Sequence, residues 1–270
     1  TYEAAVKILG LWDGEKVDEI TLDARLLELQ AWQFITLRNG RYETDPFVTL
    51  VVGEDKNAHR THYHYYQTIA FVENKRKNYS ALDVERANLE VAFEWSIQND
   101  VEGALWLFNA CSTFLSNRGR AEQRLDWIKR VVTALEDCSE KLRASAQNSL
   151  GTTYLDYPFG NRAFNLEVAM NAFQAALQYY TLEIDPLVYA MIQTNIGNTH
   201  RALAKFDDPI GNLGQAINAH QKALQYYTLE DKPDEYARTK NSLGNVYCDL
   251  AAFSRTVSER EKNLSDAIDA

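Results

Sequence analysis

The chain has 270 residues, of which 46% are hydrophobic and 24% charged, so it is long enough for a helical solenoid or for two modest domains with buried cores. Its formal net charge of −10 disfavours nucleic-acid binding, because such binding relies on Lys and Arg to neutralise phosphates. The three cysteines form no Cys-x-x-Cys pair and no apolar run approaches the ~18–20 residues of a membrane span, so we expect a cytoplasmic protein without zinc fingers or a disulfide scaffold.

Residues 1–58 are predicted to form a small winged-helix-like domain. Apolar residues recur at helical spacing in 1–12 and again in 22–34. In 35–44 the period falls to two on either side of Asn39-Gly40, a dipeptide that tolerates the positive φ angles of a tight hairpin turn. Two helices followed by one β-hairpin are the outline of a winged helix.

Residues 59–138 return to helical patterns. A Tyr-rich stretch and a second helix over 81–99 predict a helical linker at 59–99. Two further helices, divided by Arg118-Gly119-Arg120, predict a degenerate repeat-like pair at 100–138.

Residues 139–270 carry explicit internal repeats. The octapeptide ALQYYTLE occurs at 176–183 and again, 47 residues later, at 223–230, which is the mark of stacked repeat units. The first helix of each unit contains LGTTY, IGNTH or LGNVY, and the second contains NLEVAMNA, NLGQAINA or NLSDAIDA. Prolines separate the units, since Pro suits the first turn of a helix but not its interior.

A glycine recurs in the middle of each first helix, at Gly151, Gly197 and Gly244. Because a mid-helix Gly costs ~1 kcal/mol relative to Ala, its recurrence indicates a close approach of the partner helix. We expect the small residues Ala169, Ala172 and Ala176 to face this glycine in the first complete unit.

These motifs resemble tetratricopeptide repeats, whose pattern is Leu-Gly-x-x-Tyr followed by Ala-x-x-x-Phe-x-x-Ala. The resemblance implies an all-α fold, in which antiparallel helix pairs form a right-handed superhelix. The chain departs from the family in length, because 18 positions separate Gly151 from Ala169 where the family has 12. We expect the extra residues to lengthen the helices or the turn that joins them.

The order of winged helix, Tyr-rich helix and tetratricopeptide-like repeats resembles the C-terminal region of bacterial STAND-type signalling ATPases of the NB-ARC class. In that family a His-Asp pair after the hairpin senses ADP, whereas this chain has Thr44-Asp45. It also contains no G-x-x-x-x-G-K-[ST] phosphate loop, so we expect no enzymatic activity and no cofactor in these residues. Because the chain begins at Thr1 and its last repeat is unfinished, we expect it to be part of a longer protein that includes ATPase or effector domains.

The tetratricopeptide resemblance implies that the first helix of each unit lines a concave groove. Three positions per helix would face inward: three before the Gly, one after it and four after it. Asn amides there can donate to and accept from a peptide backbone, and Arg can pair with a carboxylate. The predicted ligand-binding residues are Asn148, Thr152, Thr194, Asn198, Arg201, Arg238, Asn241 and Asn245.

Other candidate chemistry is weaker. His59, His62 and His64 lie within six residues, but on a helix positions 62 and 64 point ~200° apart, so we favour a solvated helix start over a metal site. The tyrosine pairs of the octapeptide are predicted to pack between units. No Ser/His/Asp or Cys/His set has a recognisable catalytic spacing.

The sequence therefore predicts a non-enzymatic sensor and protein-interaction module that binds a protein or peptide. Two alternatives stay open. One is a DNA-binding regulator that uses the winged helix, in which Arg38, Arg41 and Arg60 would contact phosphates among acidic neighbours. The other is an oligomerisation scaffold in which the unfinished repeat stacks on a second copy.

Overall fold

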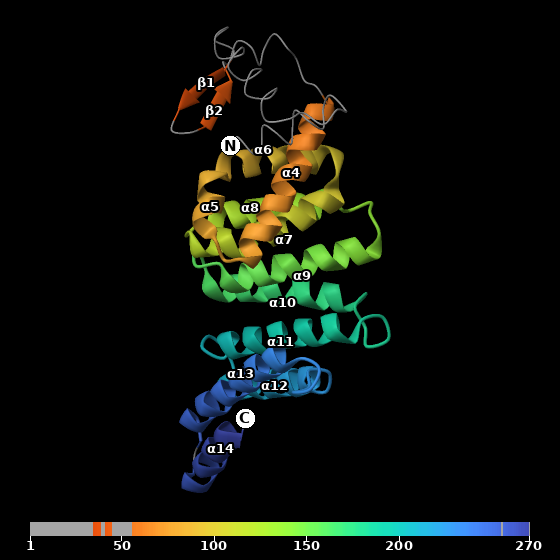
Figure 1. Cartoon of the computed structure of the whole chain (residues 1–270). Helices are drawn as coiled ribbons and strands as arrows, with labels where there is room; N and C mark the ends of the chain where they lie inside the picture. Colours follow the sequence, from red (N-terminus) through yellow and green to blue (C-terminus); the bar gives the residue numbers. More distant parts are fainter. Residues whose placement is uncertain (1–34, 39–40, 45–55, 255, 270) are drawn as a thin grey trace. The chain divides into compact units, whose positions relative to one another are not determined.

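A computed structural model describes residues 35–38, 41–44, 56–254 and 256–269 (Figure 1). The predicted helices at 1–12 and 22–34, and with them most of the predicted winged-helix domain, lie outside these residues. The chain divides into two compact units, with the boundary between Arg118 and Gly119. Each unit is described by itself.

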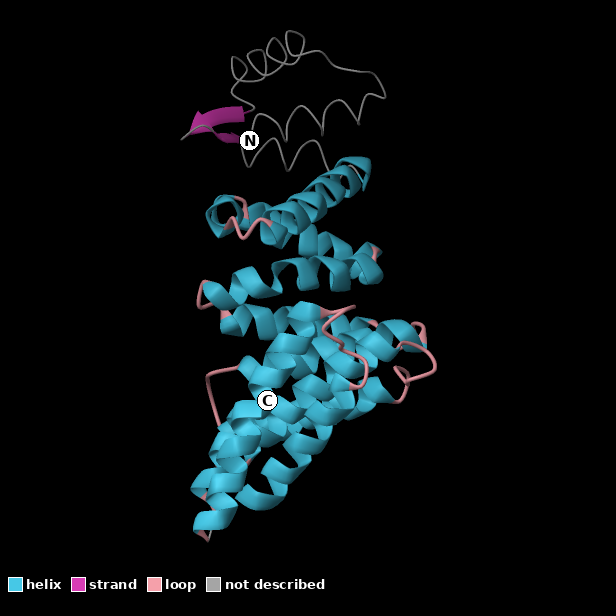
Figure 2. Cartoon of the chain, turned by 60° about the horizontal axis from the view of Figure 1, so that its bottom comes forward, coloured by secondary structure: helices cyan, strands magenta, loops and turns pink. Residues whose placement is uncertain are grey.

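Two short strands precede the helices. Strand β1 (Ile35–Arg38) pairs antiparallel with β2 (Arg41–Thr44), so that Ile35 lies opposite Thr44 and Arg38 lies opposite Arg41. This register leaves residues 39 and 40, the predicted Asn-Gly turn, between the strands, and these two lie outside the described residues. The other regular elements of the described chain are helices (Figure 2).

The described part of the first unit contains four helices, α4 (Lys56–Lys75), α5 (Tyr79–Val84), α6 (Arg86–Asn99) and α7 (Val101–Asn117). The segment predicted as one helix over 81–99 is therefore two helices, α5 and α6. Large side chains that are almost fully buried fill the space among these helices: Tyr63, Leu82, Leu89, Phe93, Leu107, Phe108 and Phe114.

A close contact joins α4 to α7. The hydroxyl of Tyr63 donates to Asp100, whose carboxylate also accepts from the backbone N–H of Gly103 and so caps α7. A Cβ at Gly103 would collide with the Tyr63 hydroxyl, so only glycine fits at this crossing. The helices α7 and α8 (Ala121–Ala134), which we predicted as one pair over 100–138, fall on opposite sides of the unit boundary, and α7 packs on α4 and α6 instead.

The second unit continues with helix pairs that follow the repeats. They are α9 (Glu140–Asp156) with α10 (Arg162–Leu177), α11 (Pro186–Leu203) with α12 (Pro209–Leu224), and α13 (Pro233–Ala252) with α14 (Val257–Asp269). The pairs follow one another in sequence order (Figure 1), and α8 packs against α9. The first helices run 17, 18 and 20 residues, so the extra residues of each repeat lengthen the helices rather than forming one long loop.

The helix starts follow from local chemistry. Asp185 and Asp208 each precede a proline, and their carboxylates accept from the backbone N–H three residues on, at 3.0 and 3.1 Å. The proline at the first helical position has no N–H that would need a partner. Each Asp-Pro dipeptide therefore marks where a helix begins.

A repeated asparagine holds the turn between the helices of a pair. The Asn165 side-chain amide donates to the Phe159 carbonyl at 2.7 Å, and the Asn212 amide donates to the Asp207 carbonyl at 2.8 Å. This contact gives the Asn of the NLEVAMNA and NLGQAINA motifs a structural role in the turn.

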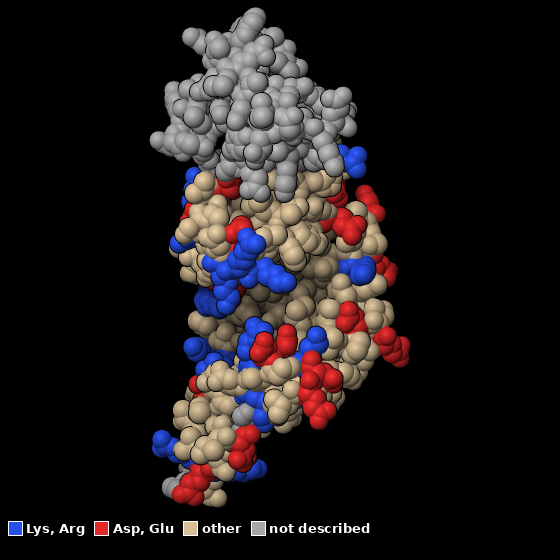
Figure 3. Space-filling view, in the orientation of Figure 1, with Lys and Arg blue, Asp and Glu red and all other residues tan. Residues whose placement is uncertain are grey.

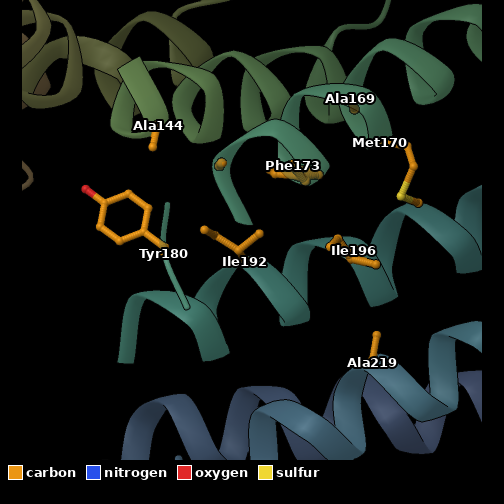
Figure 4. Packing of buried hydrophobic residues seen from close by; sticks show 9 residues of the cluster. Ala144, Ala169, Met170, Phe173, Tyr180, Ile192, Ile196 and Ala219 are labelled. Carbon is orange, nitrogen blue, oxygen red and sulfur yellow. The ribbon is translucent and has the colours of Figure 1, made fainter. Parts of the chain in front are cut away.

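The core of the second unit lies between successive helices. Phe173, Ile192 and Ile196 are buried in one cluster with Ala144 and Ala219, contributed by α9 to α12 (Figure 4). Figure 4 shows the two isoleucines projecting from α11 toward α10. Burial of such apolar side chains is the dominant favourable contribution to folding.

The recurring glycines accept an aromatic ring. A Cβ at Gly151 would lie 2.6 Å from the Phe173 ring, and a Cβ at Gly197 would lie 2.7 Å from the His220 ring. The closest neighbour of Gly151 and of Gly197 is thus the ring at the Phe position of the Ala-x-x-x-Phe-x-x-Ala pattern, and not one of the alanines that we expected. Ala169 and Ala176 are buried on the same helix as Phe173.

Candidate binding groove

The predicted groove residues all lie on the first helices of the three pairs. Asn148 and Thr152 are on α9, Thr194, Asn198 and Arg201 are on α11, and Arg238, Asn241 and Asn245 are on α13.

Two contacts join α11 directly to α13. The Thr194 and Thr239 hydroxyl oxygens are 3.4 Å apart, and Arg201 Nε donates to Asp249 Oδ2 at 2.6 Å. The first helices of two consecutive pairs therefore lie side by side, which brings the predicted residues of α11 and α13 onto neighbouring elements.

Three asparagine side chains on these helices have open hydrogen-bonding capacity. Asn241 and Asn245 are exposed and Asn198 is half-buried, and none of the three side chains forms a hydrogen bond within the described part of the chain. An amide has one acceptor oxygen and two N–H donors, which matches the alternating groups of a peptide backbone.

The two predicted arginines differ. Arg201 is half-exposed and ion-paired with Asp249, so a ligand carboxylate would have to compete with an existing partner. Arg238 has a side chain that is 76% exposed. Its Nε donates to the Asp234 carbonyl at 3.3 Å, and its Nη2 lies 4.0 Å from Glu235 Oε1, a more distant ion pair than that of Arg201. Arg238 is therefore the more accessible of the two charges.

The residues on α9 are less accessible to a ligand. The Thr152 hydroxyl donates to the backbone carbonyl of Asn148 at 3.0 Å, as Thr side chains often do within a helix. The side-chain oxygen of Asn148 is buried and has no hydrogen-bond partner among the described residues. Such an unsatisfied oxygen is costly, and its burial keeps it from a ligand at the surface.

His220, which the sequence did not single out as a functional residue, lies near Arg201. His220 is fully buried on α12, and neither ring nitrogen has a hydrogen-bond partner in the described structure. Burial, reinforced by the nearby Arg201 charge, lowers the pKa of His220 from 6.5 to about 4. The signal for it was present, because His220 stands where the preceding repeat has Phe173.

The histidine-rich segment lies on the continuous helix α4, as predicted. His64 is exposed, and the side chains of His59 and His62 lie outside the described ones. Among the residues whose side chains are described, no three His, Cys, Asp or Glu side chains come together as a metal site.

The octapeptide tyrosines are packing residues. Tyr180 and Tyr227 are both 6% exposed, and the Tyr227 hydroxyl donates to the Leu187 carbonyl at 3.2 Å. Burial raises the pKa of Tyr227 to about 12, so the hydroxyl keeps its proton and donates. The Tyr227 bond lies within the α11–α12 pair, whereas Tyr180 shares a cluster with Ile192 of the following pair, as predicted for packing between units.

A row of exposed phenylalanines follows the turns within the pairs. Phe159, Phe206 and Phe253 are each separated by 47 residues and are 51%, 53% and 46% exposed. They lie on the connecting turns or at a helix end, away from the groove positions, and form a second repeated surface feature.

Charge on the second unit is mixed rather than concentrated. Acidic and basic side chains are interspersed over α11 to α14 on the face shown in Figure 3. None of the helices in the described ranges combines the length and apolar character needed to cross a bilayer.

Comparison with models of known protein families gives no match to this chain, and comparison with curated protein sequences gives none either.

Proposed function

We propose that the chain is a non-enzymatic interaction module that binds a protein or peptide along the first helices of its repeats. The observation that carries this proposal is the pairing of α11 with α13, which presents the unpaired amides of Asn198, Asn241 and Asn245 on neighbouring helices. An extended peptide can satisfy several such amides at once through its regularly spaced N–H and C=O groups.

The wider proposal is that this module senses a ligand for a STAND-type signalling or defence ATPase. It is supported by the order of elements in the sequence, with a hairpin, a Tyr-rich helix and then tetratricopeptide-like repeats. The nucleotide chemistry would reside in other domains of such a protein. The DNA-binding alternative depends on Arg38, Arg41 and Arg60. The side chains of Arg38 and Arg41 lie outside the described ones, and Arg60 is exposed on α4.

Loss of two groove amides tests the proposal. Peptides selected from a displayed random library on the full chain are expected to bind Asn198→Ala with Asn245→Ala about ten- to thirty-fold more weakly, since each lost hydrogen bond contributes about 1 kcal/mol. The measurement is fluorescence anisotropy with labelled peptides.

The matched control changes two exposed polar residues on a second helix, Asn171→Ala with Gln174→Ala on α10. Affinity equal to the unmodified chain is expected there. If the groove variant kept full affinity for every selected peptide, or if both variants lost affinity equally, recognition would not lie along α11 and α13.

Self-association is a second candidate function, favoured by the surface of α14. Leu264 and Ile268 on α14 are 41% and 85% exposed. Their counterparts on α12, Leu213 and Ile217, lie in a cluster that is covered by residues of α13. The apolar face of α14 therefore corresponds to the face of α12 that the next first helix, α13, covers.

If a second copy covers this face, Ile268→Lys is expected to abolish a concentration-dependent rise in mass, because burying a Lys in an apolar interface is unfavourable. Sedimentation equilibrium measures the mass. Ser265→Lys adds the same charge at an exposed polar position of α14 and is expected to keep the association. A constant monomeric mass for the unmodified chain would exclude this candidate.

A further inference from the structure

A pocket of about 290 Å³ opens between the start of α9 and the end of α10. Glu140, Arg143, Ala144 and Gln147 line it from α9, and Gln178 and Tyr179 line it from the turn that follows α10. Tyr179 is half-buried and Arg143 is exposed. The pocket therefore has an aromatic wall, a cation and several polar groups at its rim.

The next repeat shows which side chain occupies the position equivalent to this pocket. Aligning Gly151 with Gly197 puts Arg143 level with Tyr189, and aligning the octapeptides puts Tyr179 level with Tyr226. In the α11–α12 pair the rings of Tyr189 and Tyr226 meet edge to face, with centroids 6.3 Å apart and planes at 79°. The α9–α10 pair has the same aromatic wall but lacks the tyrosine that packs against it.

We propose that this pocket binds a tyrosine side chain of the protein partner. The incoming ring would take the place that Tyr189 occupies in the next pair, edge to face with Tyr179. Edge-to-face aromatic pairs are favourable because the positive ring edge meets the negative ring face.

Arg143 adds to this preference. Arg143 lines the pocket, and its cationic guanidinium can attract the face of an aromatic ring that enters. Its only hydrogen bond among those described is a long one, 3.5 Å from Nη1 to the Glu136 carbonyl, so the side chain can turn toward a ligand. The carboxylate of Glu140 and the amides of Gln147 and Gln178 can bond a phenol hydroxyl, which favours tyrosine over phenylalanine.

The volume agrees with a side chain rather than a larger ligand. Pockets for drug-sized molecules run from about 300 to 1,000 Å³, and this pocket lies just under that range. The inference rests on the proposed function, because the tyrosine belongs to the protein or peptide that the module binds. It adds an anchoring site separate from the groove amides of α11 and α13.

The test is an NMR titration of the full, ¹⁵N-labelled chain with N-acetyl-tyrosinamide. A probe this small is expected to bind with a dissociation constant on the order of 1 mM and to shift the amide signals of Ala144, Gln147 and Gln178. N-acetyl-alaninamide, which lacks the ring, is expected to leave them unmoved. No shift at these amides, or equal shifts with both probes, would overturn the proposal.

Two reciprocal variants sharpen the test. Arg143→Tyr installs the residue that the next pair already has, and is expected to weaken probe binding by about ten-fold or more because the pocket is filled. Tyr189→Arg opens the equivalent place and is expected to create a second site, seen as new shifts near Tyr226. Unchanged probe binding by Arg143→Tyr, or no new site in Tyr189→Arg, would contradict the assignment.

The groove variant separates the two proposals. Asn198→Ala with Asn245→Ala is expected to bind the probe as the unmodified chain does, whatever its effect on selected peptides. If that variant lost the probe, the tyrosine would lie in the groove, and the pocket assignment would be wrong while the groove proposal stood.

Discussion

Gly151→Ala is expected to destabilise the second unit by about 2 kcal/mol, although alanine is the better helix former. The added Cβ would lie 2.6 to 2.9 Å from three atoms of the Phe173 ring, where carbon atoms normally stay about 3.5 Å apart or more. Phe173 is fully buried, so its ring has no free space into which to move. Overpacking of this kind costs about 1–3 kcal/mol and outweighs the helix-propensity gain of about 1 kcal/mol.

Gly214 in α12 provides the matched control. It is exposed, and a Cβ there would meet nothing within 4 Å. Gly214→Ala is therefore expected to stabilise the unit by about 0.5–1 kcal/mol through helix propensity alone. Urea unfolding followed by circular dichroism measures both variants, and equal effects of the two changes would show that the glycine is not required for the close approach.

His220→Phe is expected to stabilise the second unit by about 1–3 kcal/mol. The imidazole is fully buried with both nitrogens unpartnered in the described structure, so it loses its hydrogen bonds to water without replacement. A phenyl ring already occupies the equivalent slot against Gly151, where Phe173 is fully buried. The slot against Gly197 is therefore of a kind that accepts this ring.

The same change is expected to flatten the pH dependence of stability. The pKa of His220 falls from 6.5 to about 4 on folding, so between these values the unfolded chain binds a proton that the folded chain does not. The contribution of neutral His220 to the free energy of unfolding is fully present above pH 6.5 and is lost as the pH falls toward 4. The free energy of unfolding therefore changes by at most about 1.4 kcal/mol per pH unit, or by about 3 kcal/mol between the two pKa values.

The measurement compares unfolding free energies of the unmodified chain and His220→Phe from pH 7.5 to about pH 4. Their difference isolates His220, since the other titrating groups are common to both. Phe173→His is the reverse control and is expected to lower stability and add a slope of the same sign. Parallel pH curves for His220→Phe and the unmodified chain would contradict the assigned pKa direction.

Several parts of the fold followed from local sequence. The prolines between units predicted the helix starts at Pro186 and Pro233, because proline suits the first turn of a helix and not its interior. The 47-residue recurrence predicted the helix pairs, since equal sequences in equal surroundings form equal units. The groove positions were assigned from the family pattern, and the structure places them on α9, α11 and α13.

Other features depended on residues distant in sequence. The sequence predicted one helix pair over 100–138, but α7 packs on α4 and α6, and the unit boundary falls after Arg118. The partner of Arg201 is Asp249, 48 residues away on the next first helix, and no local pattern announces this pair.

By itself, the sequence determined most of the helices and the period of the repeat, because these depend on interactions between residues a few positions apart. Only the tertiary structure decided which ring packs on Gly151 and on Gly197, that His220 is buried without a hydrogen-bond partner among the described residues, and that Arg143 and Tyr179 line one pocket. Each of these depends on side chains from two or more helices meeting in space, where volume and desolvation act together.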